Sequence, residues 1–143
     1  MRVNYFGLLA MCRAFAPVLA GNGGGAIVNV LSLVALVPLW FGGSYSASKA
    51  AALSLTQSIR DELSSQRTLV IGVLPGSVDT DMTQRIEVEK VAPSVVATAI
   101  VAALRGGTED VYPGPAAGIA AALLRDPRPS SGSLRPSAPS RTA

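Results

Sequence analysis

Two short apolar runs constrain the fold of this chain more than any other feature of its sequence. Residues 26–31 and 68–74 are almost continuously hydrophobic and have the length of strands. Strands of this composition are usually buried on both faces of a parallel sheet. Between them, residues 44–65 carry apolar side chains at helical spacing. Because neighbouring parallel strands need a crossover connection, this order predicts an α/β fold.

The flanking segments continue the alternation of helix and strand. Helices are predicted for residues 4–20, 91–105 and 116–125, and a short last strand for residues 110–114. Pro17 is expected to kink its helix or end it early. Ser44 is the expected N-cap of the central helix, and Asp79 that of a helical turn further along the chain.

The glycine cluster at residues 21–25 invites interpretation as a phosphate-binding loop. That chemistry needs glycines after a strand and before a helix, so that amides at the helix N-terminus face the phosphate. Here the order is helix, glycines, strand. The cluster therefore predicts a turn.

Composition and charge exclude several functions. The chain has no histidine, which excludes a histidine general base and argues against zinc, and one cysteine, Cys12, which excludes an intramolecular disulfide. The net charge is +3, and Arg128, Arg135 and Arg141 lie in the last residues, so no basic face for nucleic acid is predicted. Arg13 interrupts the apolar N-terminal stretch, and residues 26–41 are too short to span a bilayer. No membrane segment is therefore predicted.

Tyr45 and Lys49 lie four residues apart in the central helix. Residues at this spacing share one face of a helix, so the phenol and the ammonium are expected to point into the same space. A cation within roughly 4–6 Å favours the phenolate and so lowers a tyrosine pKa. A tyrosine tuned in this way can pass a proton to or from a hydroxyl or carbonyl oxygen. Such pairs are common on helices, so the pair alone does not define a site.

Ser32 at the end of the first strand, Tyr45 and Lys49 on the next helix, and Pro75-Gly76 after the next strand together resemble the second half of a short-chain dehydrogenase/reductase. Asn4 and Gly7 match the Asn-x-x-Gly pattern of that family's preceding helix. The resemblance extends from Val3 to about Gly114. It implies part of a Rossmann-type, doubly wound parallel sheet with about three strands.

The resemblance also implies roles for these residues in hydride transfer between NAD or NADP and an alcohol or ketone. Tyr45 would be the acid/base, Lys49 would lower its pKa and bind the nicotinamide ribose, and Ser32 would donate to the substrate oxygen. Asn4 would anchor a water that links Lys49 to solvent. The carboxamide of the nicotinamide would be held by Pro75, Gly76, Val78 and Thr80.

Each of these residues also has a purely structural interpretation. Ser32 and Pro75-Gly76 fit turns, and Asn4 and Thr80 fit helix caps. The loop of residues 32–43 includes Trp40 and is apolar, which fits a wall of the substrate pocket or a packing contact. Segment 79–89 is shorter than the family's usual substrate lid, which suggests an open or differently closed site.

The resemblance begins in the middle of the family's fold. Residues 1–125 correspond to the catalytic C-terminal half, and the strands that hold the pyrophosphate would precede Met1. We therefore expect weak or absent nucleotide binding and activity from the isolated chain, and the alternative is an inactive remnant that only packs against partners. Residues 126–143 are rich in Pro, Ser and Arg and are expected to be disordered. The family's pairing helices imply a homo-oligomer, and we expect a cytoplasmic location.

Overall fold

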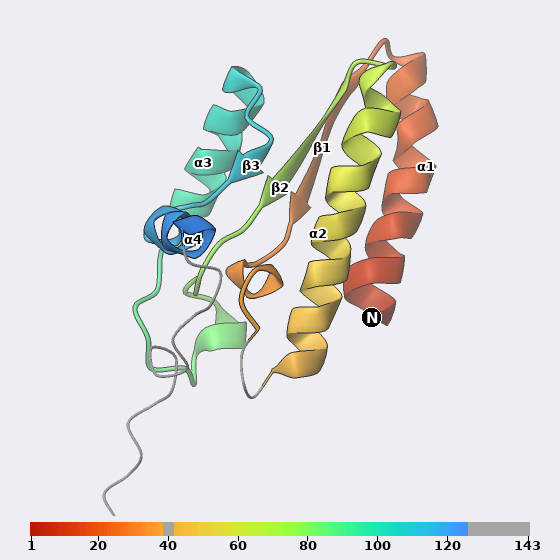
Figure 1. Cartoon of the computed structure of the whole chain (residues 1–143). Coiled ribbons are helices and arrows are strands. Elements are labelled where there is room, and N and C mark those ends of the chain that lie inside the picture. The colour runs from red at the N-terminus through yellow and green to blue at the C-terminus, as the bar shows by residue number, and fades with distance from the viewer. Residues whose placement is uncertain (39–41, 126–143) are drawn as a thin grey trace, which may run out of the picture.

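The computed structural model describes residues 1–38 and 42–125 and contains a three-stranded parallel sheet with helices on both faces (Figure 1). Strand β1 (Gly25–Val30) pairs with β2 (Thr68–Val73), and β2 pairs with β3 (Asp110–Val111). The α/β class and the parallel sheet of three strands are therefore confirmed. The disorder predicted for residues 126–143 and the pocket wall predicted at Trp40 fall outside the described residues.

The helices divide between the two faces of the sheet. The elements are, in chain order, η1 (Arg2–Gly7, a π-helix), α1 (Leu8–Gly21), η2 (Leu33–Ala35), α2 (Gly43–Ser64), η3 (Asp81–Thr83), α3 (Pro93–Gly106) and α4 (Ala116–Arg125). Helices α1 and α2 cover one face, and α3 covers the other (Figure 1). The sheet is therefore wound on both sides, as the family resemblance implied.

Strand β2 is the centre of the core because its side chains alternate between the two faces. Val70 packs with Cys12 and Ile59 beneath α1 and α2, whereas Ile71 and Val73 pack beneath α3. All three β2 side chains are 1% exposed or less. This double burial is what a continuous apolar run predicts for a central strand.

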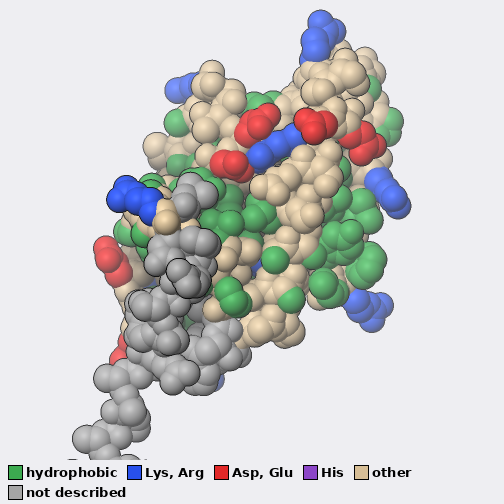
Figure 2. All heavy atoms as spheres, viewed as in Figure 1, with side chains coloured by type: hydrophobic (Ala, Val, Ile, Leu, Met, Phe, Trp, Pro, Cys, Tyr) green, Lys and Arg blue, Asp and Glu red, His purple; other side chains and the backbone are tan. Residues whose placement is uncertain are grey.

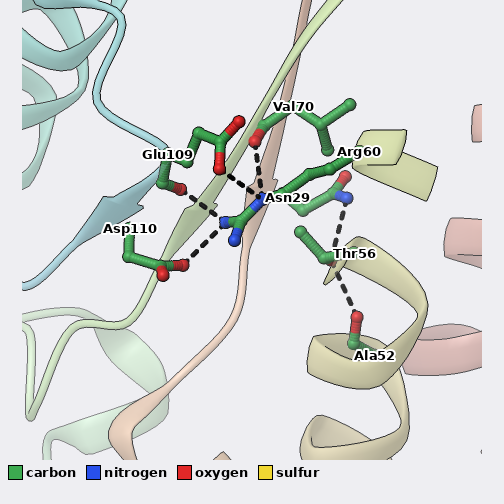
Figure 3. Close-up of polar contacts among 7 residues, drawn as sticks. All are labelled: Asn29, Ala52, Thr56, Arg60, Val70, Glu109 and Asp110. Atoms are coloured by element: carbon green, nitrogen blue, oxygen red, sulfur yellow. Dashed lines mark hydrogen bonds and ion pairs between the residues drawn. The ribbon is translucent and has the colours of Figure 1, made fainter. Parts of the chain in front are cut away.

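Strand β1 departs from the prediction of burial on both faces. Gly25, Ala26 and Val30 are exposed, and within the described residues β1 has a neighbouring strand on one side only. It is therefore an edge strand, as expected from a resemblance that begins in the middle of the family's fold. Its buried polar residue, Asn29, donates from Nδ2 to the hydroxyl of Thr56 at 3.0 Å, and this hydrogen bond fixes β1 against α2 (Figure 3).

Three details of the helices also differ from expectation. Pro17 does not end α1, which continues to Gly21, because Pro17 and the residue one turn before it are exposed and water can reach the freed carbonyl. The N-cap of α2 is Gly42 rather than Ser44, which lies inside the helix. The N-cap of η3 is Thr80 rather than Asp79, because Thr80 and Thr83 exchange the two hydrogen bonds of a capping box.

Elements η1 and α1 together form one helical segment, Arg2–Gly21, that is long and apolar enough to cross a membrane by length and composition alone. Only 6% of its most apolar window is buried. The inner side of this segment nevertheless packs against the rest of the fold, because Cys12 is 5% exposed and contacts Ile59 and Val70. The absence of a membrane segment stays a prediction.

Candidate active site

The candidate site lies where β1 and β2 end. The amide of Leu33, just after β1, donates to the carbonyl of Pro75, just after β2, at 2.9 Å. The backbone of Gly76 also faces the side chain of Leu33, since a Cβ at Gly76 would lie 3.8 Å from it. The loops that carry Ser32 and Pro75 are therefore joined at the carboxyl edge of the sheet, where open α/β sheets place their ligands.

Ser32 is extended at the end of β1 and caps the short helix η2. Its Oγ accepts a hydrogen bond from the amide of Val34 at 3.3 Å. This contact is the turn that the structural interpretation predicted. A hydroxyl that accepts in this way still has a proton to donate, and it has no acceptor among the described residues. Ser32 is thus held in place by one contact and keeps a donor for a ligand.

Tyr45 and Lys49 lie in the first two turns of α2, and η2 packs against this helix. The ammonium Nζ of Lys49 lies 5.9 Å from the centroid of the Tyr45 ring. Both side chains are half-buried and occupy the same space, as their spacing predicted. The ammonium also donates to the backbone carbonyl of Val30 at the end of β1, at 3.0 Å. Burial lowers the pKa of Lys49 below its ordinary value.

Asn4 joins the site from the π-helix η1. Its Nδ2 donates to the hydroxyl of Ser48 at 3.0 Å, and that hydroxyl donates to the backbone carbonyl of Tyr45 at 2.7 Å. A π-turn inside a helix is uncommon and often accompanies a functional residue. Asn4 is not the N-cap of η1, since that position belongs to Met1. The helix-cap interpretation of Asn4 is therefore wrong.

Val78 and Thr80 lie in a turn that is closed by its own contacts. The hydroxyl of Thr83 donates to the carbonyl of Val78 at 2.5 Å, and that of Thr80 to the same carbonyl at 3.4 Å. Val78 also forms a parallel bridge with Val91, which closes the base of the 79–90 segment. The capping interpretation of Thr80 is correct, and Thr80 is exposed.

Two groups in this region were not among the predicted site residues. They are Ser48, which lies between Asn4 and Tyr45, and the Val30 carbonyl that receives Lys49. The signal for Ser48 was its position immediately before Lys49 and three residues after Tyr45. A backbone carbonyl leaves no signal in a sequence.

The described residues include candidate contacts for the nicotinamide end of a dinucleotide only. Lys49, Tyr45 and Thr80 carry ammonium and hydroxyl groups, which are of the kind that suits sugar hydroxyls and an amide. The glycine cluster joins α1 to β1 at the amino end of that strand, opposite Ser32. Its amides are therefore placed away from the site, and it does not fit a pyrophosphate.

Comparison with known proteins identifies the class. The profile of the short chain dehydrogenase family matches residues 1–90, so the chain belongs to the short-chain dehydrogenases. A short-chain dehydrogenase from Burkholderia cenocepacia, solved in complex with NADP, is 50% identical with a TM-score of 0.83, over 87% of this chain and 53% of its own.

Two further relatives are more distant. A short-chain dehydrogenase from Sphingobium yanoikuyae, solved with NADPH, is 26% identical with a TM-score of 0.72, over 94% of this chain and 58% of its own. The NADPH-dependent 1-acyldihydroxyacetone phosphate reductase of Schizosaccharomyces pombe is 41% identical over 80 residues, which are 56% of this chain and 27% of that protein. The chain therefore spans about half the length of these solved structures and less of that curated relative.

Proposed function

We propose that this chain carries the catalytic half of an oxidoreductase that transfers a hydride between NAD or NADP and a small alcohol or ketone. The observation that carries the proposal is the placement of the Lys49 ammonium against the Tyr45 ring, beside the end of β1. Membership of the short-chain dehydrogenases and the NADP and NADPH held by two relatives support it.

In the proposed mechanism the Tyr45 phenol holds the proton that the substrate oxygen gains in reduction or loses in oxidation. The Ser32 hydroxyl donates a hydrogen bond to the same oxygen, where negative charge develops. Lys49 orients the nicotinamide ribose, and Asn4 supports a water path from Lys49 to solvent. The backbone at Pro75, Gly76 and Val78 and the Thr80 hydroxyl hold the carboxamide. When bound, the cofactor supplies or accepts the hydride.

A second candidate is a chain that does not catalyse and acts only by packing with partners. Two observations favour it: the glycine cluster faces the wrong edge of the sheet, and η1 and α1 expose a row of large apolar side chains. The members of this row are Val3, Met11, Phe15 and Val18, exposed by 82%, 57%, 50% and 53%. Figure 2 shows hydrophobic side chains gathered over the region of α1 and α2.

We infer that this row pairs with a second copy of the chain, in a cytoplasmic homo-oligomer. A shallow apolar recess between η1 and α2 is lined by Tyr5, Phe6, Leu55 and others, and neither it nor the row includes a proposed catalytic side chain. The surface for association is thus separate from the site for chemistry.

Titration of the purified chain with NADH and NADPH, followed by cofactor fluorescence, separates the two candidates. Because only the nicotinamide end is provided for, we expect binding weaker than micromolar by the chain alone. Turnover of a ketone at saturating NADPH, lost in a Tyr45→Phe variant, would support the oxidoreductase. No turnover at any cofactor concentration, with intact folding, would support the non-catalytic candidate.

A further inference from the structure

Ser48 joins two of the elements that carry the candidate catalytic side chains, η1 and α2. It is 1% exposed, and its hydroxyl uses both of its hydrogen-bonding capacities. It accepts from Asn4 of η1 at 3.0 Å and donates to the Tyr45 carbonyl of α2 at 2.7 Å. A buried hydroxyl satisfied on both sides has a fixed orientation, so it transmits the position of one partner to the other.

The two contacts of Ser48 have different consequences. A serine that donates to a carbonyl three or four residues earlier is ordinary in helices, and Ser64 does the same toward Asp61 at 2.8 Å. The contact with Asn4 is not ordinary, because it joins residues 44 positions apart and comes from an irregular π-turn. Without Ser48, the amide of Asn4 would lose its only described acceptor.

The position of Lys49 depends on the same junction. Lys49 follows Ser48 directly in α2 and spans from that helix to the Val30 carbonyl of β1. The first two turns of α2 contact η1 through Asn4 and β1 through Lys49. A shift of these turns away from η1 therefore changes the burial of the Lys49 ammonium and its contact with the Val30 carbonyl.

We propose that Ser48 is a positioning residue, which fixes Asn4 and the start of α2 so that Lys49 reaches the end of β1. The effect of Ser48 on the rate of reaction rests on the proposed oxidoreductase function. Its effect on the positions of Asn4 and Lys49 does not depend on that function. Ser48 itself touches no reacting atom. It acts through Asn4 and through the backbone of Tyr45.

The test compares the full chain with Ser48→Ala, Ser48→Thr and the matched control Ser64→Ala, which removes a similar hydroxyl from an exposed part of the same helix. Two readouts are independent of turnover: the side-chain amide signals of Asn4 and the pH titration of the Lys49 ¹³Cε signal, both by NMR. In the parent chain the side-chain amide protons of Asn4 are expected to exchange slowly with water, and Ser48→Ala should remove this protection. The same variant should raise the pH midpoint of the Lys49 titration, because the Lys49 ammonium becomes more hydrated. Ser48→Thr should restore both, and Ser64→Ala should change neither.

A third readout is the rate of ketone reduction with NADPH. Ser48→Ala should lower kcat at least about tenfold with little change in KM, since positioning contributes to the transition state rather than to binding.

If the Ser48→Ala chain does not fold, Asn4→Ala breaks the same bond from the other side and should move the Lys49 midpoint likewise. Unchanged Asn4 and Lys49 signals in folded Ser48→Ala would overturn the inference. Absence of turnover in the parent chain would contradict the proposed function and leave the two NMR readouts to decide the role of Ser48.

Discussion

The guanidinium Nη2 of Arg60 lies 2.6 Å from Oδ1 of Asp110, although the two residues are 50 positions apart. The same guanidinium donates to the carbonyls of Val70 at 3.1 Å and Glu109 at 2.7 Å (Figure 3). Arg60 therefore binds α2 to the central strand and to the start of the last strand. Within the described residues β3 has two residues and one neighbouring strand, so this side chain adds to the backbone hydrogen bonds that hold it in place.

Replacing Arg60 by alanine should destabilise the fold. The side chain is 13% exposed and makes charge-assisted hydrogen bonds, and the loss of such a set costs about 2 kcal/mol when the partners can still reach water. Asp110 and Glu109 are exposed enough to be rehydrated, at 39% and 53%. Urea unfolding followed by circular dichroism measures the change.

Two comparisons sharpen this prediction. Arg60→Lys should recover less than half of the loss, because an ammonium cannot reproduce the planar fork that reaches three acceptors. Arg13→Ala, which removes an exposed arginine from α1, is the control and should stay within about 0.5 kcal/mol of the parent chain. Equal stability of the Arg60→Ala and Arg13→Ala chains would contradict the assigned role.

Most of the fold could be predicted from the sequence because the patterns that indicate strands and helices are local. The apolar runs and helical periods identified every strand and α-helix within a few residues, and the spacing of Tyr45 and Lys49 placed them on one face. The features it missed depend on tertiary context. The exposure of β1 depends on which strand lies beside it, and the Arg60 contacts join residues whose proximity no local pattern records.

The same distinction applies to the candidate site. The resemblance to the short-chain dehydrogenase/reductases predicted Ser32, Tyr45 and Lys49 as site residues, and the fold places them near the carboxyl end of β1. The partners of these residues could not be predicted in the same way. Asn4 reaches Ser48 from the π-helix η1 across 44 residues, and Lys49 reaches a backbone carbonyl, which every residue possesses.

Gly24 offers a prediction about the turn between α1 and β1. Its φ is +118°, and a Cβ at this position would overlap the carbonyl oxygen of Arg67. Gly24→Ala should therefore cost about 3 kcal/mol or more in the free energy of unfolding, or prevent folding altogether. The neighbouring Gly23, with φ of +82° and only a flexible arginine tip at 3.7 Å, is the matched control. Gly23→Ala should cost about 1 kcal/mol. Equal losses in the two variants, measured by thermal unfolding, would show that the close approach to Arg67 is relaxed in solution.

Phe15 provides a test of association through the α1 row. The Phe15 ring is 50% exposed, and the opposite side of its helix packs against the sheet. Phe15→Glu places a charge in the proposed contact, so the dissociation constant of the homo-oligomer should rise at least tenfold. Light scattering after size-exclusion chromatography measures it. Val101→Glu, on the outer face of α3 at 45% exposure, is the control and should leave the mass unchanged. A parent chain that is monomeric at all concentrations would refute the pairing.

Lys49 gives a prediction about pH. Burial lowers the pKa of its ammonium in the folded chain, whereas the unfolded chain keeps the ordinary value of about 10.5. Between the lowered pKa and 10.5 the unfolded chain binds more protons, so this group makes the free energy of unfolding rise with pH in that window. Lys49→Met removes this contribution, and the stability of the parent chain relative to the variant should therefore increase from pH 8 to pH 10.5.

Other groups also titrate in this range, so the difference between two proteins is the quantity to measure. Burial raises the pKa values of Cys12 and Tyr112, which acts in the opposite direction, but both groups are common to the parent chain and the variant and cancel in the difference. Lys90→Met controls for the loss of one lysine charge elsewhere. Urea unfolding at half-unit steps of pH gives each difference. A parent-minus-variant difference for Lys49→Met that stays flat or falls with pH would show that the ammonium is fully hydrated in solution and does not rest between Tyr45 and the end of β1.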